Sequence, residues 1–272
     1  MAAMDNPEFR AAVQRPDEQI ELTRAALLFA RDAFPDLDIE LYLNQLAEWA
    51  ADAQSAVARS PDPIDALNHF LFDLLRFTGN RLFYNDPLNS YLNKVIDRRT
   101  GLPITLAVIY LDIAWRLGLP VAGVGLPGHF IVRTLEGAPR FIDVFHQGKE
   151  LTEGDCRRLV SELSEGQVAF DPSMLAPVGP RLILGRMLNN LKNAYLHQNK
   201  FEAALSPVER LIDLQPDEPA HLRDLGLLHY QLDRYDLALP LLNHYTVLAA
   251  VPTDDPVRQI IGNIQTYIAR LN

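Results

Sequence analysis

Residues 103–117 read PITLAVIYLDIAWRL, and this stretch decides the fold. Pro103 at its start and Gly118 just past its end are typical residues for the two limits of a helix. Its strongly polar residues are Thr105, Asp112 and Arg116. A helix that is apolar nearly all round has to be buried, so the sequence predicts the central helix of a domain here.

Helices are predicted before this central helix in the sequence, and strands are predicted after it. Helical spacing of apolar residues before it predicts helices at about 18–34, 38–58, 63–77 and 88–99. After it, residues rich in Val, Ile and Phe predict strands at about 120–124, 129–135 and 140–145. Helices first and an antiparallel sheet afterwards predict an α+β fold. The proline-rich residues 170–181 are expected to mark the domain boundary.

The composition argues against several classes of partner. The chain carries 25 Lys and Arg against 35 Asp and Glu, a net charge of −10, whereas nucleic-acid binders usually need a basic surface. The single cysteine excludes a disulfide framework and a cysteine-rich zinc site. There is no signal-peptide pattern and no apolar run of about 20 residues. We therefore expect a cytoplasmic protein with no nucleic-acid or membrane partner.

A repeat of 34 residues follows from Gly185 onward. Leu191 and Leu225, Phe201 and Tyr235, and Ala204 and Ala238 are equivalent pairs at this period. The alanines allow paired helices to approach closely. The pattern resembles the tetratricopeptide repeat family, with residues 256–271 as a capping helix; an ordinary helical bundle is the alternative.

Residues 1–16 show no period and are predicted to be a loose end.

His129 and Asp143 are the candidate site. If the hairpin is centred near Glu136, the two residues face each other across neighbouring strands. A histidine oriented by an aspartate is the base half of a nucleophilic triad. A register error of one residue would put them on opposite faces, and a purely structural hydrogen-bonded pair is the alternative.

Three motifs carry a resemblance. GLPITLA at 101–107, GHF at 128–130 and FIDVF at 141–145 resemble the transglutaminase-like, papain-like core. The resemblance implies that His129 and Asp143 match the catalytic histidine and aspartate, and that Pro103 stands where the nucleophilic cysteine belongs. Residues 86–133 are similar to the bacterial SirB-type family, which implies a transglutaminase-like domain over 17–175 followed by tetratricopeptide repeats over 182–272.

Two other residues are weak candidates for a nucleophile. Thr105 is the hydroxyl nearest the start of the central helix, but a threonine there more often bonds to a backbone carbonyl. Cys156 lies at a predicted helix start, but a lone cytosolic cysteine is more often a small core residue. The histidines lack the spacing of a zinc-binding helix face, and no glycine-rich phosphate loop occurs, so no metal or cofactor is predicted.

The favoured function is therefore non-catalytic. We expect a regulatory or protein-interaction protein, a pseudoenzyme that binds a protein or peptide through the groove of the repeats and the adjoining cleft. The alternative is an active hydrolase or acyltransferase. It would use His129 and Asp143 with water, Thr105 or Cys156 as the nucleophile.

Overall fold

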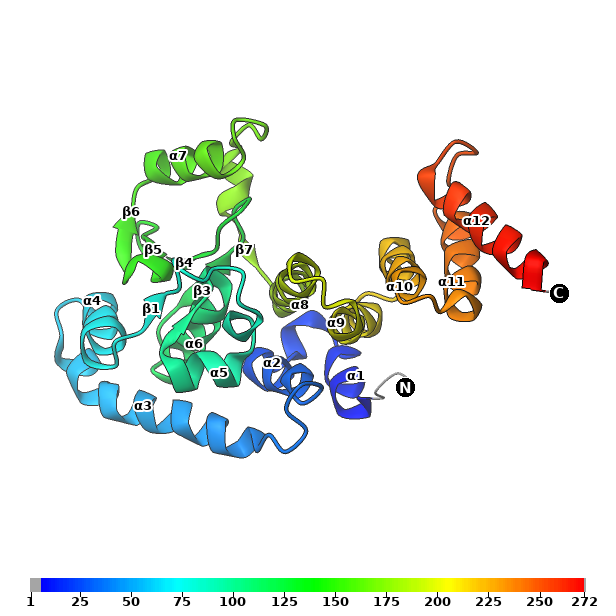
Figure 1. Cartoon of the computed structure of the whole chain (residues 1–272). Helices are drawn as coiled ribbons and strands as arrows, with labels where there is room; N and C mark the ends of the chain where they lie inside the picture. Colours follow the sequence, from blue (N-terminus) through cyan, green and yellow to red (C-terminus); the bar gives the residue numbers. More distant parts are fainter. Residues whose placement is uncertain (1–5, 272) are drawn as a thin grey trace. The chain divides into compact units, whose positions relative to one another are not determined.

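The computed structural model describes residues 6–271 and divides into two compact units. The first unit is Arg15–Met187; the second combines Leu188–Asn272 with Met1–Gln14 (Figure 1). The predicted α+β class is confirmed. None of the helices within the described range is both long and apolar enough to cross a membrane.

The first unit begins with helices, as predicted. They are α2 (Leu22–Ala30), α3 (Ile39–Arg59), α4 (Pro63–Asn68), α5 (Leu92–Arg98) and α6 (Pro103–Arg116). Asp38 caps α3 by accepting a hydrogen bond from the N–H of Leu41, which fixes the helix start. The predicted helix at 63–77 is shorter, because after Asn68 the chain widens into a π-helical turn, His69–Leu74.

The sheet of this unit is antiparallel and has the order β6-β5-β4-β3-β7. Its strands are β3 (Val121–Val124), β4 (Ile131–Thr134), β5 (Phe141–Asp143), β6 (Lys149–Leu151) and β7 (Pro177–Val178). A separate parallel pair joins β1 (Thr78–Gly79) to β2 (Thr100–Gly101). Strand β7 lies in the proline-rich stretch predicted as the domain boundary, and its edge position suits a proline.

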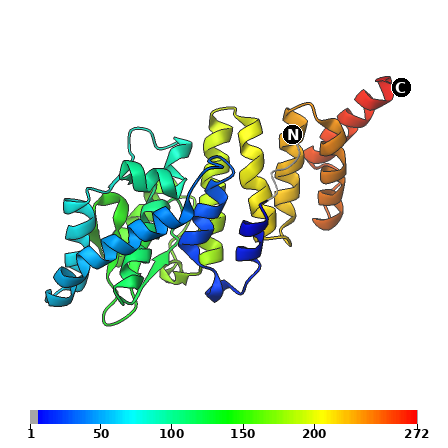
Figure 2. The ribbon, with the colours of Figure 1, turned by 90° about the horizontal axis from the view of Figure 1, so that it is seen from below.

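Helix α6 is the buried centre of the unit, as predicted. Every residue from Pro103 to Ala114 is buried, and the helix contacts β3 and β4 of the sheet. Helix α3, which runs along this unit in Figure 2, contacts α6 as well. Helix α7 (Glu153–Leu163) follows β6 and starts at a capping box formed by Thr152 and Asp155.

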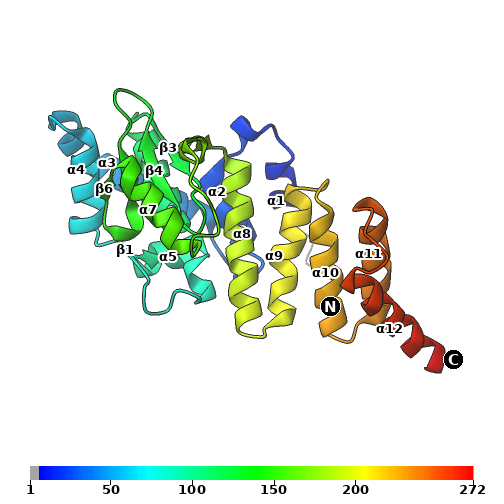
Figure 3. The ribbon, with the colours of Figure 1, turned by 90° about the horizontal axis from the view of Figure 1, so that it is seen from above.

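The second unit consists mainly of successive antiparallel helices (Figure 3). They are residues 188–197 of α8 (Pro180–His197), then α9 (Phe201–Leu214), α10 (Pro219–Gln231), α11 (Tyr235–Leu248) and α12 (Pro256–Leu271). The repeat alanines Ala204 and Ala238 are fully buried. A Cβ on Gly226 would lie 2.6 Å from the side chain of Leu242, so any larger residue here would force that side chain to move and loosen the packing of α10 against α11.

The N-terminal segment belongs to the second unit. Residues Pro7–Val13 form helix α1, capped by the Asn6 side chain, which accepts a hydrogen bond from the N–H of Phe9 at 3.0 Å. The helix contacts α9, where Arg10 pairs with Asp213 at 2.7 Å. The predicted loose end is therefore wrong for residues 6–13; a helix of two turns is too short to give a periodic pattern. Residues 1–5 lie outside the described range.

Candidate functional site

His129 is held by a tight turn just before β4. The N–H of His129 donates to the carbonyl of Leu126 at 3.1 Å, and Gly128 has a φ of +72°, which suits a type II turn with Pro127 before it. Arg186 donates to the carbonyl oxygens of Leu126 and His129, at 2.9 Å each. The backbone that carries the imidazole is thus fixed at both ends of the turn.

Asp143 and His146 are placed by one local motif. Asp143 ends β5, and its Oδ1 accepts hydrogen bonds from the N–H groups of Phe145 at 3.1 Å and His146 at 3.2 Å. The carboxylate thereby caps the single 3-10 turn Val144–His146. This turn folds His146 back toward the aspartate that caps it.

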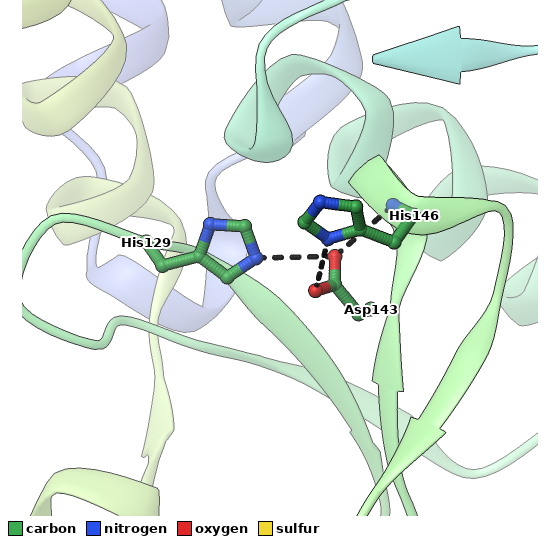
Figure 4. A group of neighbouring side chains, drawn as sticks. All are labelled: His129, Asp143 and His146. Carbon is green, nitrogen blue, oxygen red and sulfur yellow. Dashed lines mark hydrogen bonds and ion pairs between the residues drawn. The ribbon is translucent and has the colours of Figure 1, made fainter. Parts of the chain in front are cut away.

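The three side chains form one cluster, with the carboxylate between two imidazoles (Figure 4). His129 Nε2 lies 3.1 Å from Asp143 Oδ1, and His146 Nδ1 lies 2.7 Å from Asp143 Oδ2. His129 and Asp143 are 6% and 1% exposed, whereas the His146 side chain is 34% exposed. The contact of His129 is within ion-pair distance, but its Nε2 has no well-aligned hydrogen bond among the described residues.

The strand register differs from the predicted one by two residues. Strands β4 and β5 pair Val132 with Ile142 and Arg133 with Phe141, so Asp143 is in line with Ile131 rather than with His129. Side chains alternate with a period of two along a strand, so this difference leaves His129 and Asp143 on the same face. The two side chains meet along a diagonal, which long side chains can span.

The Asp143 carboxyl is an anion at neutral pH. Burial alone would raise its pKa, but the contacts with His129 and His146 outweigh burial and hold the pKa below its usual range. The site therefore keeps one buried negative charge between two nitrogen bases.

The positions expected for a nucleophile offer none. Pro103 is the first residue of α6, and Leu102 before it makes no side-chain cap. Thr105 is fully buried and its Oγ1 donates to the carbonyl of Asn89 at 2.7 Å. Cys156 is fully buried in a cluster with Leu151 and Val160, and burial raises the pKa of its thiol to about 11. At neutral pH that thiol is protonated, and neither residue is hydrogen-bonded to His129.

His146 is the member of the cluster that sequence reasoning missed. The spacing of a helix face does not apply to His146, which follows its aspartate by three residues in a 3-10 turn. The usable signal is an Asp-x-x-His motif that runs off the end of a predicted strand, with a second histidine on the neighbouring strand.

A cavity of about 480 Å³ leads from solvent to the cluster. Asp143 and His146 line it together with residues of both charges: Arg81, Lys149, Asp155, Arg158 and Glu162. A larger cavity of about 650 Å³ in the same unit lies near the end of α6, lined by Asp112 and Trp115, and does not include the cluster. The smaller cavity is therefore the one relevant to the site.

Known proteins resemble the chain over most of its length. The family described as "Transglutaminase-like superfamily" matches residues 40–189, and "Tetratricopeptide repeat" matches residues 191–264. A UPF0162 protein of Xylella fastidiosa is 37% identical over 255 residues, covering 91% of this chain and 90% of that protein. F-box only protein 21 of Homo sapiens is 36% identical over 137 residues, covering 47% of this chain and 21% of that protein.

Among solved structures, menin aligns over 89% of this chain and 68% of its own, at 11% identity and a TM-score of 0.40. A likeness this weak supports no inference about fold or function. The sequence matches, together with the two units and the His129–Asp143 pair, agree with the resemblance seen in the motifs. The chain belongs to the UPF0162, SirB-type family, in which a transglutaminase-like domain precedes tetratricopeptide repeats.

Proposed function

We propose that the protein is a non-catalytic binding protein whose repeats hold an extended peptide segment of a partner. The observation that carries this proposal is a cavity of about 390 Å³ in the second unit. It is lined by residues of α8, α9 and α10, the helices of the first repeat and the first helix of the second. Stacked helical repeats generally bind their partners on the concave surface that their helices form.

The chemistry of this cavity suits a peptide. Its apolar walls, which suit an apolar side chain, are Leu196, Phe201, Leu227 and Leu228. Asn193 and Gln231 are exposed at its edge, and their amides can pair with a peptide backbone. Lys192 on α8 and Asp224 on α10 form an ion pair of 2.7 Å, which gives the cavity one fixed polar side.

The first unit supports a non-catalytic reading. A transglutaminase-type reaction needs a thiolate at the start of the central helix, and Pro103 supplies neither a thiol nor an N–H group there. Thr105 and Cys156 are buried and bonded or packed elsewhere. His129 and Asp143 are thus a base and its orienter without a nucleophile.

We expect purified protein to incorporate no amine into glutamine substrates and to cleave no peptide. The reason is the missing thiol at position 103, because neutral water or a buried hydroxyl cannot form the acyl-enzyme intermediate. Incorporation of a fluorescent amine into a glutamine substrate measures the first activity. Release of fluorescence from a fluorogenic peptide measures the second. Reproducible turnover that disappears in His129→Ala would contradict the proposal and favour the hydrolase or acyltransferase alternative.

The binding site is tested by site-specific crosslinking. A photo-crosslinking amino acid at position 193, at the edge of the cavity, should give a defined adduct with a partner protein in native cells. The matched control is the same group at Val247, which is 76% exposed on α11 and outside the cavity. Loss of the adduct on adding Leu227→Arg in the cavity would support the proposal. Equal adducts from both positions, or none from position 193, would sink it.

A further inference from the structure

We infer that His129, Asp143 and His146 form a binding site for a divalent transition metal ion. This inference departs from the sequence-based expectation of no metal and does not depend on the peptide-binding proposal. It starts from the geometry: one ligand atom from each of the three residues lies within 4.8 Å of the other two. Within the described chain they are the group of metal-binding residue types that converges in this way.

The distances are close to those of a metal centre. Zinc–nitrogen bonds of about 2.0–2.1 Å and zinc–oxygen bonds of about 2.0–2.2 Å put two ligands of one ion roughly 3–3.5 Å apart. His129 Nε2 lies 3.1 Å from Asp143 Oδ1, within this range, and His146 Nδ1 lies 2.7 Å from the other carboxylate oxygen, Oδ2, slightly below it. The remaining pair of ligand atoms belongs to His129 and His146 and lies within 4.8 Å. A modest rotation of the partly exposed His146 ring would bring these two atoms to the separation of two ligands of one ion.

The ligand types select the metal. Two imidazoles and one carboxylate suit zinc or ferrous iron, whereas calcium and magnesium prefer oxygen ligands alone. Three protein ligands also leave at least one coordination position open. That position would face the cavity of about 480 Å³ that Asp143 and His146 line, which provides a path for entry.

A second observation points to a ligand here independently of the distances. His129 is 6% exposed, and its Nε2 points to the cluster without a well-aligned hydrogen bond. A buried polar atom without a well-aligned hydrogen bond is unfavourable and calls for an explanation. A bound metal ion would give Nε2 a well-aligned partner in place of its 3.1 Å contact with Asp143 Oδ1, and would be held by the one anion of the cluster, Asp143.

Hydrogen bonds outside the cluster also hold the proposed ligands in place. The backbone N–H groups of Phe145 and His146 hold Asp143 Oδ1, and Arg186 holds the turn that carries His129 through two carbonyl oxygens. Such outer contacts fix ligand orientation before the metal arrives. In the adjoining cavity Arg158 is paired with Asp155, which reduces its repulsion toward a cation.

The test uses the full chain without a histidine tag, freed of metal by a chelator and titrated with Zn²⁺ by calorimetry and with Co²⁺ by visible absorption. Wild-type protein should bind one ion per chain with a ligand-field spectrum of a nitrogen- and oxygen-bound Co²⁺. His146→Ala should weaken Zn²⁺ binding by at least about 100-fold, since even outer-shell changes cost 10–100-fold. The matched control is His69→Ala, because His69 forms an exposed pair with Asp73 at 2.8 Å outside the cluster.

Two further measurements on the wild-type protein apply if His146→Ala folds poorly. X-ray absorption of the Zn²⁺-loaded wild-type protein should show two imidazole ligands, and Zn²⁺ should raise the thermal midpoint of the wild type. The inference is overturned if wild-type protein binds no more ion than His146→Ala. It also fails if His69→Ala loses as much affinity, or if the bound ion shows no imidazole ligands.

Discussion

An Asp143→Ala variant should lose about 3–5 kcal/mol of unfolding free energy, the range for removing one partner of a buried ionic contact. Asp143 is 1% exposed, lies 3.1 and 2.7 Å from the two imidazoles, and accepts hydrogen bonds from two backbone N–H groups. Alanine would leave those N–H groups without their acceptor and release the turn that holds His146. The measurement is urea unfolding followed by tryptophan fluorescence, which reports on the first unit because both tryptophans, Trp49 and Trp115, lie in it.

Asp73→Ala is the matched control for this prediction. Asp73 also bonds a histidine, at 2.8 Å, but its side chain is 69% exposed. Exposed pairs contribute little, so the change should stay within about 0.5 kcal/mol. Equal effects of the two substitutions would mean that the buried cluster does not exist in solution.

A Phe9→Ala variant should destabilise the second unit by about 3–5 kcal/mol, the usual effect of deleting a buried phenylalanine ring. Phe9 is fully buried, and its helix α1 contacts α9. Hydrogen exchange of peptides from α9 is the direct readout, because loss of α1 should expose that helix. The control is Ala11→Ser, an exposed position on the same helix. Unchanged protection of α9 in Phe9→Ala would show that α1 does not stabilise it.

The fold was largely predictable because its strongest signals are local. Helix α6 is apolar on every side and has a proline and a glycine at its limits, so its burial followed from the sequence. The 34-residue spacing of the repeat positions likewise depends on contacts between neighbouring helices. Helix α1 could not be predicted in this way, because its stability comes from α9, far along the chain.

The candidate site was predictable only in part. The alternation of side chains along the strands predicts that His129 and Asp143 lie on one face of the sheet. A register difference of two residues leaves this prediction unchanged. The register itself depends on the turn after β4, which the sequence did not specify. His146 joined the cluster through a backbone cap made by Asp143, a contact that no helical or strand period encodes.

Helix α1 has a consequence for how the protein is made. It leaves the ribosome before every other described element, and its partner Asp213 is 203 residues further along than Arg10. At about 5–20 residues per second, the wait is on the order of 10–40 s. The first unit can be completed during that time, while Phe9 has no α9 to cover it. A chaperone that binds nascent chains would therefore find an apolar target in α1 during this interval.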